Sequence, residues 1–146
     1  GRAAAPLPDL AEVTAAALLH DIAKTLCIQT SCHHAEVGRR ICIELGYPEI
    51  GEIVAEHVVL NNFTAELYRR GLFGTKEIVF YADKRVRHDQ VVVLADRLVY
   101  ILERYGDGNP QKEKFIKMNF QRTVDLETML FSFLDFTPEE VLFHMS

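Results

Sequence analysis

Apolar residues recur at helical spacing along most of this 146-residue chain. The first such run begins at Asp9, and its apolar positions are Leu10, Val13, Ala17, Leu18 and Ile22. Positions three and four apart lie on one face of a helix. No stretch sustains the period-two alternation of a strand, apart from a few residues near Val91. The sequence therefore predicts an all-α fold, a compact multi-helix bundle.

Start and stop signals divide this pattern into separate helices. We expect helices over about 9–24, 33–45, 48–59, 76–86 and 90–105, then one or two more over 111–133 and 138–144. A loop is expected from residue 25 to 31, and 61–75 is expected to be irregular with a short helical turn. The length fits one domain covering 1–146.

The overall charge argues against two classes of partner. The formal net charge is −5, whereas a general nucleic-acid binder would carry a basic stripe. No apolar run approaches the roughly 20 residues that span a bilayer. We therefore expect neither a nucleic-acid partner nor a membrane partner, while a small phosphorylated ligand remains compatible because local charge decides its binding.

The three cysteines are Cys27, Cys32 and Cys42. Their odd number and the absence of a CxxC pair predict no disulfide framework. We expect three reduced thiols that pack as small apolar residues, and a cytoplasmic protein. The alternative interpretation of CIQTSCHH as a Cys/His zinc site lacks a second ligand pair at structural-zinc spacing.

Several residues that can bind metals interrupt or border apolar helical faces. His20 and Asp21 are adjacent within the run ALLHDIAKTL, His34 opens the second predicted helix, His57 closes the third, and Asp83 lies in the fourth. Each of these residues alone would ordinarily face solvent or form a hydrogen bond. As an ordered set, they let four helices offer an imidazole or a carboxylate to one interior, a combination that suits a divalent transition metal.

The ordered set resembles the HD-domain superfamily of metal-dependent phosphohydrolases, in particular the branch with HDIG- or HDIAK-type motifs. The matching stretches are ALLHDIAK at 17–24, HHAEVG at 33–38, EIVAEHV at 52–58 and EIVFYADKRV at 77–86. The resemblance covers roughly residues 10 to 105, which would be the motif-bearing core of the domain. Residues 106–146 carry no matching motif and are expected to form a helical C-terminal extension.

The resemblance implies a set of metal ligands and a catalytic pair. The implied ligands are His20, Asp21, His34, His57 and Asp83, and they would hold one or two divalent ions of Fe, Mn, Co, Ni or Zn, with Mg as a further option. Lys24 would contact a substrate phosphate and would form the catalytic pair with Asp21. The expected reaction is cleavage of a phosphate ester or phosphoanhydride, most naturally of a nucleotide, by a metal-activated water.

One feature of the family pattern has no counterpart here. The superfamily pattern begins with a further ligand histidine on a preceding helix, and residues 1–19 contain no histidine. We interpret the chain as lacking the first family helix and as a piece of a longer multidomain protein. The alternatives are a regulatory or ligand-binding module with a degenerate metal site, and a purely structural helical domain.

Overall fold

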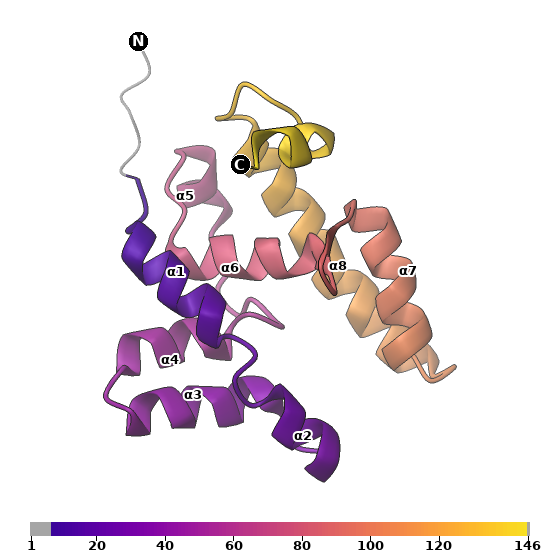
Figure 1. Cartoon of the computed structure of the whole chain (residues 1–146). Helices are drawn as coiled ribbons and strands as arrows, with labels where there is room; N and C mark the ends of the chain where they lie inside the picture. Colours follow the sequence, from indigo (N-terminus) through magenta and orange to yellow (C-terminus); the bar gives the residue numbers. More distant parts are fainter. Residues whose placement is uncertain (1–6, 146) are drawn as a thin grey trace. The chain divides into compact units, whose positions relative to one another are not determined.

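The computed structural model describes residues 7–145, and this part of the chain is mainly helical (Figure 1). It forms two compact units. The chain up to Asn62 together with Leu72–Phe80 makes the first unit, and Phe63–Gly71 together with the chain from Tyr81 onward makes the second. The predicted all-α fold is confirmed, while the assignment of the whole chain to one domain stays a prediction.

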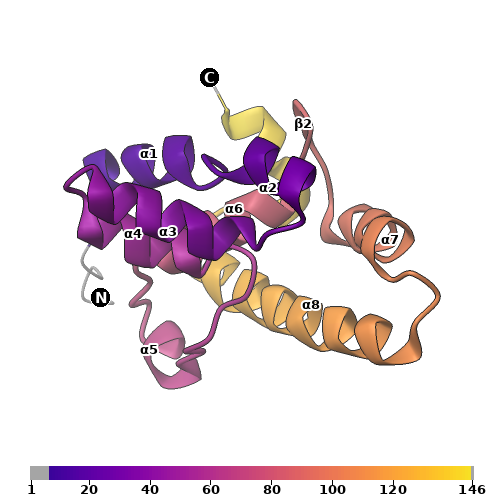
Figure 2. The ribbon, with the colours of Figure 1, turned by 90° about the horizontal axis from the view of Figure 1, so that it is seen from below.

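The first unit is built around a helical hairpin. Its helices are α1 (Leu10–Leu19), α2 (Lys24–Thr30), α3 (His34–Glu44), α4 (Pro48–Ala55) and the start of α6 (Thr75–Lys84). Helices α3 and α4 lie side by side in both views, while α1 packs on α4 and α2 packs on α3 (Figures 1 and 2). Gly46 ends α3 with a φ of 91°, a conformation that glycine adopts without strain.

Small residues let the hairpin helices approach closely. A Cβ atom added to Gly38 of α3 would lie 2.9 Å from the Cγ1 of Val54 on α4, closer than carbon atoms pack. Gly51 of α4 is equally confined, since its Cβ would lie 2.9 Å from the carbonyl oxygen of Arg39. The core beside this contact contains Ala16, Ile53 and Val79, from three different helices. The hairpin thereby holds residues 34 and 57 on one compact support.

The second unit contains the remaining elements. They are α5 (Ala65–Arg69), the end of α6, β1 (Val86–Arg87), β2 (Gln90–Val91), α7 (Leu94–Tyr105), α8 (Pro110–Phe131) and the 3-10 helix η1 (Pro138–His144). The two strands are antiparallel, with Val86 opposite Val91. Helix α8 packs against α7 and α5 (Figure 2).

A buried arginine joins three helices and the segment after β2 in the second unit. The Arg85 guanidinium donates to the Tyr81 hydroxyl at 2.6 Å, to the Val92 carbonyl at 2.7 Å and to the Pro138 carbonyl at 2.7 Å. It also lies 3.5 Å from the Glu127 carboxylate, which accepts a short hydrogen bond from Tyr81. Burial raises the pKa of the Tyr81 hydroxyl most, and the hydrogen bond to Glu127 raises it further.

Three predicted boundaries are wrong, and the first lies at the HD pair. The first helix ends at Leu19, not near Lys24, and the expected loop contains α2. The carbonyl of Ala17, which a longer helix would use for its next turn, accepts a hydrogen bond from the His20 ring at 2.6 Å. Residues 20–23 form a turn in which the Lys24 amide donates to the Asp21 carbonyl at 2.9 Å.

The other two corrections concern α4 and α7. Helix α4 stops at Ala55, because the amides of Glu56 and His57 bond three residues back and tighten the last turn. Helix α7 begins at Leu94, because the β1–β2 hairpin occupies the start of the predicted segment. The turn between β1 and β2 places His88 at a φ of 56°, as a tight β-hairpin requires.

Candidate metal centre

The HD pair lies where α1 ends. His20 is the C-cap residue of α1, and Asp21 follows in the turn that leads to α2. The Nε2 of His20 lies 3.5 Å from Oδ2 of Asp21, and both side chains are partly buried. The helix end therefore presents an imidazole and a carboxylate toward one point, which a continuous helix would have turned apart by about 100°.

Two histidines from the helical hairpin meet this carboxylate. His34, the first residue of α3, places its Nε2 at 3.4 Å from Oδ1 of Asp21, and His57, just after α4, places its Nε2 at 3.3 Å from the same oxygen. The two Nε2 atoms lie 3.1 Å apart. Asp21, His34 and His57 thus form a triangle of three potential ligand atoms with nearly equal sides.

Backbone carbonyls fix the orientation of two of the imidazoles. The Nδ1 of His57 lies 2.6 Å from the Val54 carbonyl, and the Nδ1 of His20 lies equally close to the Ala17 carbonyl. In both cases Nδ1–H is the donor, because a carbonyl oxygen only accepts, and the bond orients the ring so that Nε2 faces Asp21. These carbonyls are three residues before each histidine, and sequence reasoning missed their role because every residue carries one.

The charge of Asp21 is strongly stabilised. Burial raises the pKa of the Asp21 carboxyl, but hydrogen bonds with His34 and His57 and the nearby charges of His20 and Lys24 outweigh it. Together they hold the pKa of Asp21 well below its usual range. Asp21 is therefore a carboxylate, the form that binds metals, at any pH near neutrality.

The lysine that is predicted to contact a substrate phosphate also lies close to the Asp21 carboxylate. Lys24, the first residue of α2, places its Nζ 3.2 Å from Oδ2 of Asp21. Its side chain keeps 43% of its surface exposed, so the ammonium group is accessible to a ligand in solution.

The remaining predicted ligand, Asp83, lies in the last turn of α6 and belongs to the second unit. Its carboxylate is partly buried and lies 3.1 Å from the Nζ of the buried Lys84. Its membership of the ligand set stays a prediction.

The geometry within the first unit fits a single divalent ion. Ligand atoms bound at about 2.0–2.1 Å to one ion lie about 2.8–3.4 Å from each other when the angle between the bonds is about 90–109°. The Asp21–His34–His57 triangle has sides of 3.1, 3.3 and 3.4 Å. One carboxylate and two imidazoles suit Zn, Fe, Mn, Co or Ni.

Comparison with known protein families matches residues 2–101 to the HD domain. The chain belongs to the HD-domain family. This family consists generally of metal-dependent phosphohydrolases, so membership implies binding of a divalent metal. No curated protein and no solved structure matches the chain. Within residues 7–145 of this HD domain protein, no helix has the length and apolar character needed to cross a bilayer.

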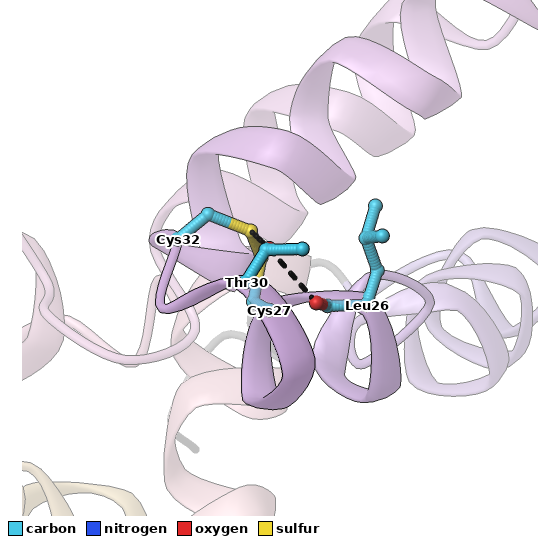
Figure 3. Close-up of a disulfide and its surroundings, with 4 residues drawn as sticks. All are labelled: Leu26, Cys27, Thr30 and Cys32. Carbon is cyan, nitrogen blue, oxygen red and sulfur yellow. Dashed lines mark hydrogen bonds between the residues drawn. A yellow bond between two sulfur atoms is a disulfide. The ribbon is translucent and has the colours of Figure 1, made fainter.

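The expectation of three reduced cysteines is wrong for two of them. Cys27 and Cys32 form a disulfide (Figure 3). Both cysteines lie between Lys24 and His34 in the sequence. Ser31 has a φ of 58°, which reverses the chain after α2 and brings the two Cα atoms to 4.5 Å. Sequence spacing could not reveal this pairing, because it depends on the left-handed conformation of one residue. Only Cys42 is a free thiol, and it is buried.

Proposed function

We propose that this HD-domain protein hydrolyses a phosphate ester or phosphoanhydride, with a nucleotide as the favoured substrate class. The observation that supports the proposal most directly is the triangle formed by Asp21, His34 and His57, whose ligand atoms lie 3.1–3.4 Å apart. The likeness of ALLHDIAK to the HDIG- or HDIAK-type branch supports the nucleotide. The protein would act in the cytoplasm on a small soluble substrate.

In this proposal His20, Asp21, His34, His57 and Asp83 hold one or two divalent ions. When bound, such an ion supplies Lewis acidity toward a phosphoryl oxygen and activates a water molecule for attack. Asp21 contributes a negative charge that three neighbouring imidazoles and Lys24 surround. His57 contributes rigidity, since its side chain is 1% exposed and its Nδ1 is hydrogen-bonded to the Val54 carbonyl.

Lys24 is the proposed contact for the substrate phosphate. Its ammonium group neutralises Asp21 in the absence of substrate. A phosphoryl oxygen would be an additional acceptor for this group, and a charge-assisted hydrogen bond to it would stabilise negative charge that develops during hydrolysis. The role requires an accessible ammonium, which the half-exposed side chain provides.

The test combines metal analysis with phosphate release. The purified chain is analysed for bound metals and then assayed for phosphate release from p-nitrophenyl phosphate, nucleoside mono-, di- and triphosphates and a dinucleoside tetraphosphate, with Mn, Co, Ni, Zn, Fe or Mg added. We expect release from at least one phosphorylated nucleotide. The Asp21→Asn variant should lose this phosphate release. The Asp89→Asn variant, at an exposed position of the turn between β1 and β2, should keep it.

The regulatory alternative makes a different prediction for the same assay. A binding module would take up the metal and a nucleotide but release no phosphate with any of these ions. If the chain binds no metal at all, both the proposed phosphohydrolase activity and the alternative of a regulatory module with a metal site are wrong.

A further inference from the structure

Helix α2, which separates Lys24 from His34, is short and weakly anchored. It has seven residues, and only Cys27 among them is buried. Its N-cap residue, Ala23, makes no side-chain capping bond. Isolated helices need roughly 12–15 residues to be even marginally stable in water. The order of α2 therefore depends on what holds Cys27.

The disulfide crosslinks this one buried residue of α2 to the segment that enters α3. Cys32 lies one residue beyond Ser31, whose φ of 58° turns the chain back toward α2. The Thr30 hydroxyl donates to the Leu26 carbonyl at 2.9 Å and lies 3.3 Å from the sulfur of Cys32 (Figure 3). These local bonds are exposed to solvent, so the covalent link is the strongest restraint on the turn.

Both ends of the crosslinked segment reach the metal centre. At one end, Lys24 is 3.2 Å from Asp21, and at the other His34 is 3.4 Å from it. We propose that the Cys27–Cys32 disulfide is a redox-controlled restraint that holds Lys24 and His34 in position at this centre. The inference rests on the proposed function for its consequence, which is weaker metal and phosphate binding by the reduced protein.

The chemistry requires a dithiol as reductant. One dithiol thiolate attacks the sulfur of Cys32, because Cys32 is a half-buried residue whereas Cys27 is buried. The S–S bond breaks, and Cys27 leaves as a thiolate and takes up a proton. The second thiolate of the reductant then attacks the mixed disulfide and releases Cys32, so that the cysteine pair gains two electrons and the reductant becomes a disulfide. In a reducing compartment, disulfides are usually transient or redox-sensing.

The size of the effect follows from the length of the closed loop. For a crosslink between residues five apart, the chain-entropy model gives at most about a 30-fold change in the equilibrium for local opening. Amide hydrogens protected by α2 should therefore exchange faster after reduction, up to this limit. The Cys27 amide, which donates to the Ala23 carbonyl, reports on α2, and the Val37 amide, which donates to the His33 carbonyl, reports on the first turn of α3.

The experiment compares the oxidised and the reduced chain, with dithiothreitol as the reductant. Thiol alkylation after denaturation, followed by mass spectrometry, first counts the free thiols, and we expect one in the oxidised form and three in the reduced form. Hydrogen exchange and the affinity for Mn²⁺ are then measured on both forms. We expect faster exchange at the Cys27 and Val37 amides and at least threefold weaker Mn²⁺ binding after reduction.

Matched variants separate the disulfide from other effects of the reductant. Cys27→Ser/Cys32→Ser should behave like the reduced protein with or without dithiothreitol, and Cys42→Ser should respond as the wild type does. Three free thiols after treatment with oxidised glutathione, or equal exchange and equal Mn²⁺ affinity in both forms, would overturn the proposal. Faster exchange after reduction, with neither form binding any of Mn, Co, Ni, Zn, Fe or Mg, would support the restraint and defeat the proposed function instead.

Discussion

The Nε2 atoms of His34 and His57 lie 3.1 Å apart, although 23 residues separate the two histidines in the chain. His34 opens α3 and His57 follows α4. The short connection between these helices reverses the chain, so that the end of α4 lies beside the start of α3. Two imidazoles this close together, with Asp21 3.3–3.4 Å from both, have the spacing expected of three ligands to one divalent ion. The helical hairpin is therefore the support of the proposed metal centre.

Replacement of Asp21 should remove the metal. Asp21→Asn keeps the size of the side chain but loses the charge that His20, His34, His57 and Lys24 surround. We expect the affinity for metal to fall by more than the roughly 10–100-fold typical of a lost outer-shell partner. Isothermal titration of the metal-free protein with Mn²⁺ measures it, and Asp89→Asn is the matched control. Unchanged stoichiometry and affinity in Asp21→Asn would contradict the ligand assignment.

Replacement of Lys24 should separate catalysis from metal binding. Lys24→Met keeps most of the apolar stem and removes the ammonium, so phosphate release should fall by about 100-fold while bound metal stays at the wild-type level. Phosphate release and elemental analysis on the same preparation check both parts. Lys112→Met, at an exposed lysine of α8, serves as the control. Equal activity of Lys24→Met and Lys112→Met would argue against a phosphate contact.

The lowered pKa of Asp21 predicts how stability depends on pH. Ionised Asp21 stabilises the folded state at pH values above about 4, the pKa of an unperturbed aspartate, and this contribution is lost as the pH falls further. The metal-free wild type should therefore lose more free energy of unfolding between pH 5 and pH 2 than Asp21→Asn does. Urea unfolding at a series of pH values measures the difference. Parallel curves for the two proteins would show that Asp21 gains no stabilisation from its neighbours.

The contact between α3 and α4 should tolerate no larger residue at position 38. A Cβ there would meet the Cγ1 of Val54 at 2.9 Å, so Gly38→Ala should cost about 1–3 kcal/mol of stability, although alanine favours helices. Val54→Ala removes that carbon, and the double variant should be more stable than the sum of the single effects predicts. Strict additivity in urea unfolding would mean that the two side chains do not compete for space.

The Arg85 network should be important for the second unit. Arg85→Met removes hydrogen bonds to Tyr81, Val92 and Pro138 and leaves the Glu127 carboxylate without its charged neighbour. We expect a loss of about 3 kcal/mol in the free energy of unfolding, as for other broken buried pairs. Arg104→Met, at an exposed position of α7, should cost far less. Similar stability of both variants would assign the network no net contribution.

The sequence was a good guide wherever local physics decides the outcome. Helical periodicity predicted α3, α6, α8 and η1 within a few residues, and the Gly46–Pro48 signals correctly ended α3 and began α4. The approach of His34 to His57 follows from the hairpin, which these same local signals specify. The resemblance carried by the ordered motifs was sufficient to expect the HD domain.

Other features depend on single conformations that periodicity does not encode. The turn at His20 arises because a side chain competes with the backbone for the Ala17 carbonyl. The disulfide arises because Ser31 adopts a left-handed conformation, for which serine gives no sequence signal. For the same reason the orienting role of the Val54 carbonyl becomes visible only in three dimensions.

Cys42 has no exposed surface, and burial raises the pKa of its thiol. In the reduced protein, where we expect α2 to loosen, a maleimide dye should therefore attach to Cys27 and Cys32 and spare the third sulfur. The wild-type chain thus offers two neighbouring attachment points for spectroscopic labels beside the HD pair, with no need to engineer a cysteine-free background.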